Sequence, residues 1–125
     1  MTLWALALAS LAVAAPALPQ TAGHEPGGAR LEQNVPNPFT PGVSPTIFTF
    51  AIPEEARVRL TVYNLLAQEV AILADETMER GTHRVAWDGI DARGQAVPAG
   101  VYWYKLEAGE LRPVLRRLRV RDSPE

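Results

Sequence analysis

Two aspartates and a glycine, Asp88, Asp91 and Gly94, have the spacing that comes closest to a metal-binding loop. The pattern D-G-x-D-x-x-G offers carboxylate and carbonyl oxygens, which are the ligands of Ca²⁺. It lacks the remaining ligand positions of an EF-hand and the bidentate glutamate that closes one. Aspartates in tight connections also accept hydrogen bonds from backbone N–H groups two residues on. We therefore favour Asx turns and predict neither a metal nor a cofactor.

This chain has few residues that could serve as catalytic nucleophiles or bases. The two histidines, His24 and His83, lie far apart with no third ligand at metal spacing, and we interpret His83 as a residue at the edge of the core. The serines are Ser10, Ser44 and Ser123, too few and too scattered for a Ser-His-Asp arrangement. Cysteine is absent, which excludes a disulfide framework, a thiolate nucleophile and a lipidated cysteine. We predict that the protein is not an enzyme.

The stretch Gly81–Leu106 organises the chain. Apolar and polar residues alternate over Thr82–Trp87, a turn-rich connection follows, and an aromatic strand covers Val101–Leu106. We predict a long β-hairpin arm in which Trp87 is the main core anchor. In the aromatic strand the tyrosine side is predicted to be buried, because Lys105 on the opposite side requires water.

Further strands are predicted over Thr46–Ile52, Arg57–Tyr63, Glu69–Leu73 and Leu111–Arg121. The third carries Val70 and Ile72 on one side and is followed by a polar connection over Asp75–Arg80. Tyr63–Ala74 could be a helix by propensity alone, but we interpret it as a turn plus a strand. Proline-rich Leu31–Gly42 is predicted to be a non-helical lead-in outside the sheets, with Phe39 at the core edge. The predicted core comprises Phe48, Phe50, Val58, Leu60, Val62, Val85, Trp87, Tyr102, Tyr104 and Leu106.

About seven short strands, with turn residues between them, predict an all-β, immunoglobulin-like antiparallel β-sandwich. The composition agrees with one globular domain, since 47% of the residues are hydrophobic and 21% are charged. We expect the domain at residues 31–121 and a tail at residues 122–125.

The N-terminus predicts export. Leu3–Ala15 is an uncharged, apolar run with the length of a signal-peptide core, and small residues offer cleavage sites near residues 14–17. The run is too short for a permanent membrane span. Residues 1–15 are therefore expected to be a signal peptide, and residues 16–30, rich in Pro, Gly and Ala, a flexible linker. The expected location is the periplasm in transit, then the cell surface or the medium.

The last predicted strand is basic. Leu111–Arg121 contains five arginines and no acidic residue, although the whole chain has a net charge of −2. Positive charge on a solvated edge strand prevents edge-to-edge association, which is a sufficient explanation. The alternative is a docking edge for an acidic partner. We predict no nucleic-acid binding, because the protein is expected to be exported and is acidic overall.

Three separated motifs resemble one family. They are L-E-Q-N-V-P-N-P-F from Leu31, V-Y-N-L-L-A-Q-E-V from Val62, and the stretch Gly81–Leu106. Together they resemble the C-terminal sorting domain (type A) of type IX secretion cargo and the related immunoglobulin-like domain of the flagellar hook-capping protein. The resemblance implies capture of the folded domain by the outer-membrane secretion machinery.

The family's motifs correspond to particular residues of this chain. They are Pro36-Asn37-Pro38, Gly100 and Tyr102 of a Gly-x-Tyr motif, and the terminal strand motif Arg117, Leu118, Arg119 and Val120. Ala67 stands where the family usually has a turn glycine. Family members usually carry an effector domain ahead of this module, whereas here a linker precedes it. The chain is therefore expected to be a stand-alone module or part of a longer protein.

Two classes of function follow from the sequence. The first is a sorting module for type IX secretion, recognised at the exposed edge of its last strands, with strand addition as one possible mode. The second is a structural or adhesive immunoglobulin-like module that binds other exported proteins through its sheet faces.

Overall fold

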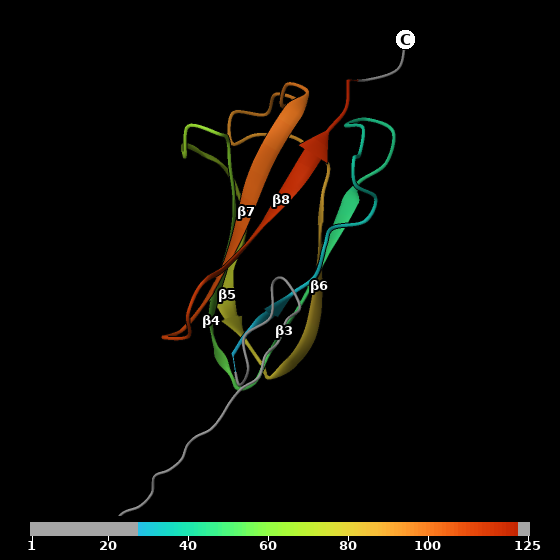
Figure 1. The fold of residues 1–125 in the computed structure, drawn as a ribbon. Coiled ribbons are helices and arrows are strands. Elements are labelled where there is room, and N and C mark those ends of the chain that lie inside the picture. The colour runs from blue at the N-terminus through green and yellow to red at the C-terminus, as the bar shows by residue number, and fades with distance from the viewer. Residues whose placement is uncertain (1–27, 123–125) are drawn as a thin grey trace, which may run out of the picture.

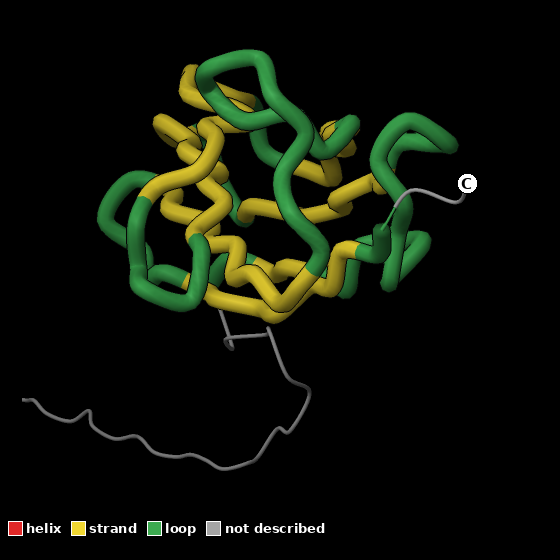
Figure 2. Tube along the Cα trace, turned by 90° about the horizontal axis from the view of Figure 1, so that it is seen from above, coloured by secondary structure: helices red, strands yellow, loops and turns green. Residues whose placement is uncertain are grey.

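The computed structural model describes residues 28–122, which form two antiparallel sheets packed face to face (Figure 1). The described part contains no helix, and viewed from above the strands form two layers with loops over them (Figure 2). One sheet has the order β2-β3-β6 and the other β5-β4-β7-β8. The strands are β2 (Arg30–Leu31), β3 (Thr46–Ile52), β4 (Ala56–Tyr63), β5 (Glu69–Met78), β6 (Gly81–Trp87), β7 (Gly100–Ala108) and β8 (Val114–Val120). The prediction of an all-β immunoglobulin-like sandwich is confirmed.

The core lies between the sheets and is built from alternate residues of each strand. In β3 the buried residues are the ones that the alternation picks out, because side chains of a strand point to opposite faces in turn. In β4 Val58, Leu60 and Val62 also follow the alternation, but Thr61 between them is buried as well. Phe48 of one sheet meets Tyr104 of the other edge to face, with ring centroids 4.6 Å apart. Val85 is only partly buried and packs against the rim of the core. Buried members of the predicted set are Phe48, Phe50, Val58, Leu60, Val62, Trp87, Tyr102, Tyr104 and Leu106.

The predicted hairpin of Gly81–Leu106 is wrong. β6 pairs with β3 over its whole length, from Thr46 opposite Trp87 to Ile52 opposite Gly81, whereas β7 lies in the other sheet between β4 and β8. The connection of residues 88–99 crosses from one sheet to the other, a distance of about 10 Å in a sandwich. Period-two alternation shows which face of a strand is buried but not which strand it pairs with, so it could not detect this crossing.

Strand β5 is longer than predicted and buries a different set of residues. It continues to Met78, so the expected polar connection from Asp75 is largely strand. Ala71 and Ala74 face the core, while Ile72 is 43% exposed. Register shifts against β4 between Leu60 and Thr61 and between Val62 and Tyr63 cause this, because a bulge moves the later residues of a strand to the other face.

The folded part begins before the predicted boundary at Leu31. Ala29 is 1% exposed, and Arg30 pairs with Ala51 in the first sheet, so these two residues are not linker. The lead-in that follows has cis peptide bonds at Val35-Pro36 and Asn37-Pro38. The predicted signal peptide, most of the predicted linker and Ser123–Glu125 lie outside the described residues. Between residues 28 and 122 no helix has the length and hydropathy needed to cross a membrane.

Candidate functional site

The proline-rich lead-in runs along the outer edge of β8 and pairs with it. The N–H of Phe39 donates to the carbonyl of Arg119 at 3.1 Å, and the N–H of Arg121 donates to the carbonyl of Phe39 at 2.8 Å. Between these two bonds, the side-chain oxygen of Asn37 accepts from the N–H of Arg119 at 2.8 Å. The lead-in therefore occupies the edge of β8 at Arg119 and Arg121.

A further contact to this edge comes from earlier in the lead-in. The side-chain amide of Gln33 donates to the carbonyl of Arg117 at 2.7 Å, so this carbonyl on the same edge of β8 also has a partner. The prediction that the last strand offers an exposed edge for strand addition is thus wrong over Arg117–Arg121. A covered edge protects the sheet from edge-to-edge association, which the arginines were expected to do by charge alone.

The Gly-x-Tyr motif lies on the other side of the same strand. Gly100 pairs with Val120 and Tyr102 with Leu118 in the β7–β8 ladder. The hydroxyl of Tyr102 donates to the carbonyl of Pro98 at 2.6 Å, and burial raises the pKa of this phenol. Gly100 has φ of 149°, within the range that favours glycine. The structure thus brings together, around β8, three motifs that are far apart in the sequence.

A buried polar cluster holds the start of the lead-in, and no sequence pattern pointed to this cluster. Asn34, 1% exposed, donates from its side chain to the hydroxyl of Thr46 at 2.9 Å. Its backbone N–H donates to the hydroxyl of Tyr104 at 3.0 Å, and that hydroxyl donates to the carbonyl of Glu32 at 2.7 Å. Burial raises the pKa of Tyr104 to about 12, while the hydrogen bond from Asn34 and the charge of Arg116 oppose this rise. Tyr104 was predicted as core only. The two backbone groups that bond its hydroxyl, the N–H of Asn34 and the carbonyl of Glu32, come from a distant segment and meet it only in the folded chain.

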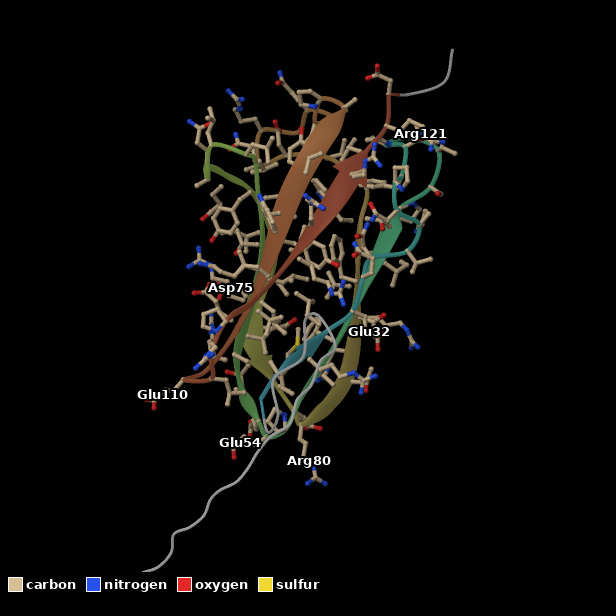
Figure 3. All side chains as sticks on the ribbon, in the orientation of Figure 1. Glu32, Glu54, Asp75, Arg80, Glu110 and Arg121 are labelled. Atoms are coloured by element: carbon tan, nitrogen blue, oxygen red, sulfur yellow. The ribbon has the colours of Figure 1, made fainter. Side chains whose placement is uncertain are left out.

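The arginines of the basic strand take two different environments. Arg116 is half-buried and donates to the carbonyl of Leu31 at 2.9 Å and to the side-chain oxygen of Gln33 at 3.1 Å. Arg117 and Arg119 are exposed on the outer face of the sheet, since they alternate with buried Leu118 and Val120. Arg121 follows the end of β8, at the opposite end of the sandwich from Glu110 (Figure 3). Only part of the predicted basic stripe therefore faces outward.

The aspartates of the 88–99 connection make the predicted Asx turns. One carboxylate oxygen of Asp88 accepts from the N–H of Ile90 at 3.1 Å, and one of Asp91 accepts from Arg93 at 2.9 Å and from Gln95 at 3.0 Å. The hydrogen bond from Gln95 is the largest cause of the lowered pKa of Asp91, with smaller help from Arg93 and Gly94 and opposed by partial burial. Among residues 28–122 no group of three His, Cys, Asp or Glu side chains could hold a metal ion.

His83 packs beside Phe50, with ring centroids 5.6 Å apart, and its Nε2 lies 2.7 Å from the carbonyl of Glu79. It therefore has a structural contact at the edge of the core. The other histidine, His24, lies outside the described residues.

Comparison with known proteins gives a structural neighbour and a family. The neighbour is PorZ, described as an essential bacterial surface component of the type-IX secretion system of Porphyromonas gingivalis. It matches with a TM-score of 0.49 and 22% identity over 71% of this chain, and the match spans 11% of that chain. No curated protein matches the sequence. The model of the FlgD Ig-like domain matches residues 34–110, from Asn34 of the polar cluster to the turn before β8. Because this match spans more than half of the sequence, the chain belongs to the FlgD Ig-like domain family.

Proposed function

We propose that this domain is a non-catalytic, exported module that acts as a sorting signal for type IX secretion. Its partner in this role is the outer-membrane secretion machinery, and its final location is the cell surface or the medium. Export rests on the predicted signal peptide at residues 1–15, followed by a linker that ends near Gly28. The proposal takes residues 29–121 as the sorting domain.

The observation that carries the proposal is that two of the three motifs flank β8, which itself contains the third. Pro36-Asn37-Pro38 flanks one edge of this strand through the hydrogen bond from Arg119 to Asn37. Gly100 and Tyr102 pair with the other edge. A signal that is read after folding needs its recognised residues in one place, and this arrangement provides that although the motifs span more than eighty positions of sequence.

The covered edge of β8 changes how such recognition works. Strand addition requires free N–H and C=O groups along an edge. Here the lead-in already bonds Arg119 and Arg121, so the machinery reads the outer face of β8 and the lead-in beside it. The recognised side chains in this proposal are Asn37, Arg117 and Arg119.

A secretion assay tests the proposal. A folded reporter carrying a signal peptide is fused to residues 28–125 and expressed in a bacterium with an intact type IX system. The same fusion is made without residues 111–125, with Asn37→Ala, and with Arg84→Ala as a control on the other sheet. We expect reporter outside the cell for the intact domain and the control, reduced export for Asn37→Ala, and reporter trapped in the periplasm for the deletion.

The deletion also removes a core strand, so protease resistance of each domain is measured in the same cells. Intact domain that is protease-resistant but stays in the periplasm would refute the sorting role. Asn37→Ala keeps β8 and its buried residues but removes the hydrogen bond from the N–H of Arg119, so reduced export is assigned to recognition only if this variant is as protease-resistant as the intact domain.

A second candidate function is a structural or adhesive module that binds other exported proteins. The observation that favours it is the family match itself, since the FlgD Ig-like model ends at residue 110 and does not include β8. Under this alternative the reporter remains in the periplasm for all fusions, and binding depends on the sheet faces.

A further inference from the structure

The outer face of the four-stranded sheet carries two adjoining hollows. One, of about 460 Å³, is lined mainly by arginines of β8 and by Gln33 and Asn37 of the lead-in. The other, of about 250 Å³, is lined by Tyr63, Leu65 and Lys105. Trp103 and Leu115 line both hollows and so lie where the two adjoin. The result is one groove with a basic half and an apolar half.

The register of the sheet places these side chains together. Tyr63, Trp103 and Arg117 lie side by side on three neighbouring strands, and Lys105 lies beside Leu115 in the next row. The guanidinium of Arg117 lies 5.9 Å from the centroid of the Trp103 ring. Trp103 on β7 is 36% exposed and Leu115 on β8 is 51% exposed, and together they form an exposed apolar patch on this face.

Charges on this face divide into a neutralised side and a positive side. Toward β4 and β5, Arg57 pairs with Asp75 at 2.8 Å and Arg59 with Glu69 at 3.7 Å, and on β7 Lys105 lies 3.8 Å from Glu107. On β8, Arg117 and Arg119 form no ion pair with any carboxylate of residues 28–122. Positive charge without a counter-charge thus remains at the basic half of the groove.

This asymmetry restricts what can occupy the groove. A second copy, packed face to face through its β8 strands, would bring Arg117 and Arg119 close to the same residues of its partner, which costs free energy. Strand addition along β8 is excluded at Arg119 by the lead-in. The occupant must therefore lie over the outer face of β8, and not pair along its edge, and it must present negative charge beside apolar side chains.

We propose that this groove binds an acidic, extended peptide segment of another protein, with its carboxylates at Arg117 and Arg119 and an apolar side chain against Trp103 and Leu115. In a strand, residues two apart are roughly 6.6–6.8 Å apart, which is the spacing of these two arginines and also of alternate carboxylates in an extended peptide. The groove includes Arg117 and Arg119, which the proposed sorting function also uses, so the inference deepens that function by naming the chemistry of the partner. Peptide binding is measured apart from export, so the two proposals can fail separately.

Binding is tested with purified protein by fluorescence anisotropy. The probe is a short fluorescein-labelled peptide with the pattern Asp-Ser-Asp-Ser-Leu, in which both aspartates and the leucine point to the same side when the peptide is extended. Two matched peptides carry lysine or asparagine in place of aspartate, and a labelled single-stranded oligonucleotide serves as the alternative polyanion. We expect saturable binding of the aspartate peptide that weakens as salt is raised, because the arginines are solvent-exposed.

The protein variants are Arg117→Glu/Arg119→Glu and, as a control with the same change in net charge, Arg80→Glu/Arg84→Glu at β6 and the turn before it. The first should weaken binding of the aspartate peptide roughly tenfold or more, and the control by less than about twofold. Trp103→Ala should weaken binding several-fold without abolishing its salt dependence. Thermal unfolding of each variant verifies that the domain remains folded.

Several results of this assay would overturn the inference. They are no saturable binding of the aspartate peptide, equal losses in the two double variants, and equal binding of the lysine or asparagine peptide. Tighter binding of the oligonucleotide than of the aspartate peptide would also overturn it, in favour of nucleic acid. A failed secretion assay with intact peptide binding would reject the sorting role and leave this groove in place.

Discussion

Replacing Tyr104 by phenylalanine removes one oxygen atom from the centre of the polar cluster and leaves the aromatic ring against Phe48. The hydroxyl accepts from the buried N–H of Asn34 at 3.0 Å and donates to the carbonyl of Glu32 at 2.7 Å. Its loss leaves the N–H of Asn34, a residue 1% exposed, without a partner. A buried donor left unsatisfied costs about 1–3 kcal/mol, so we expect the free energy of unfolding at pH 7 to fall by about 2 kcal/mol.

The ionisation of this hydroxyl determines how the stability lost in Tyr104→Phe changes with pH. Burial raises the pKa of Tyr104 from 10.0 to about 12 in the folded state. Between these values the unfolded chain has released the phenolic proton and the folded chain still holds it, so rising pH favours unfolding. The stabilisation is complete below about pH 10 and is lost as the pH rises to about 12. Phenylalanine has no such proton, so the gap between the two proteins should narrow over this range by on the order of 1–2 kcal/mol, after allowance for solvent screening.

Urea denaturation followed by tryptophan fluorescence, at pH 7 and at several values from pH 9 to 11.5, measures both effects. Tyr63→Phe is the matched control, since Tyr63 is only partly buried, and it should change stability by less than about 0.5 kcal/mol. A loss below about 0.5 kcal/mol for Tyr104→Phe at pH 7 would contradict the role given to the hydrogen bonds. A gap that stays constant or widens from pH 9 to 11.5 would contradict the raised pKa.

Three further substitutions test the fold. Thr61→Val should raise the free energy of unfolding by about 1 kcal/mol, because the buried Oγ1 of Thr61 has no hydrogen-bond partner in the described chain; an unchanged or lower urea midpoint would count against this. Ala67→Gly should stabilise by about 0.5–1 kcal/mol, because Ala67 has φ of 65°, and a lower midpoint in the same assay would refute the reasoning. Trp87→Ala should cost about 3–5 kcal/mol, because Trp87 is 4% exposed, packs against Phe39 with ring centroids 5.6 Å apart and donates to the carbonyl of Ile90 at 2.9 Å; a loss under about 1 kcal/mol would contradict its assignment to the core.

The alternation of apolar and polar residues was sufficient to predict the buried face of the strands in which it is regular. β3 and β4 have the predicted inward faces, because Phe48, Phe50, Val58 and Leu60 are separated by residues that favour water. The buried side of β7 followed from the position of Lys105 among its neighbours. The Asx turns of the 88–99 connection could also be predicted, since they depend on side chains that bond backbone groups two to four residues away.

Features that depend on distant segments could not be predicted in this way. The sheet change between β6 and β7 and the bulges of β5 are set by pairing partners, which leave no mark on a local period. The partners of Asn34 lie 12 and 70 positions away in the sequence. Likewise, the arginines of β8 read as one basic stripe, but the fold divides them between a contact with the lead-in and an outward groove.

Because the lead-in pairs with β8, this part of the fold cannot form until the last strand has been synthesised. Asn37 and the N–H that it binds are 82 positions apart, so a ribosome adding about 5–20 residues per second delivers them roughly 4–16 s apart. Until β8 has been made, the lead-in has no strand to pair with, and β7, once made, has only β4 as a neighbour. A chain that stops before Val114 has neither the covered edge nor the basic half of the groove. Wherever the chain folds, this surface therefore forms only when the final strand is present.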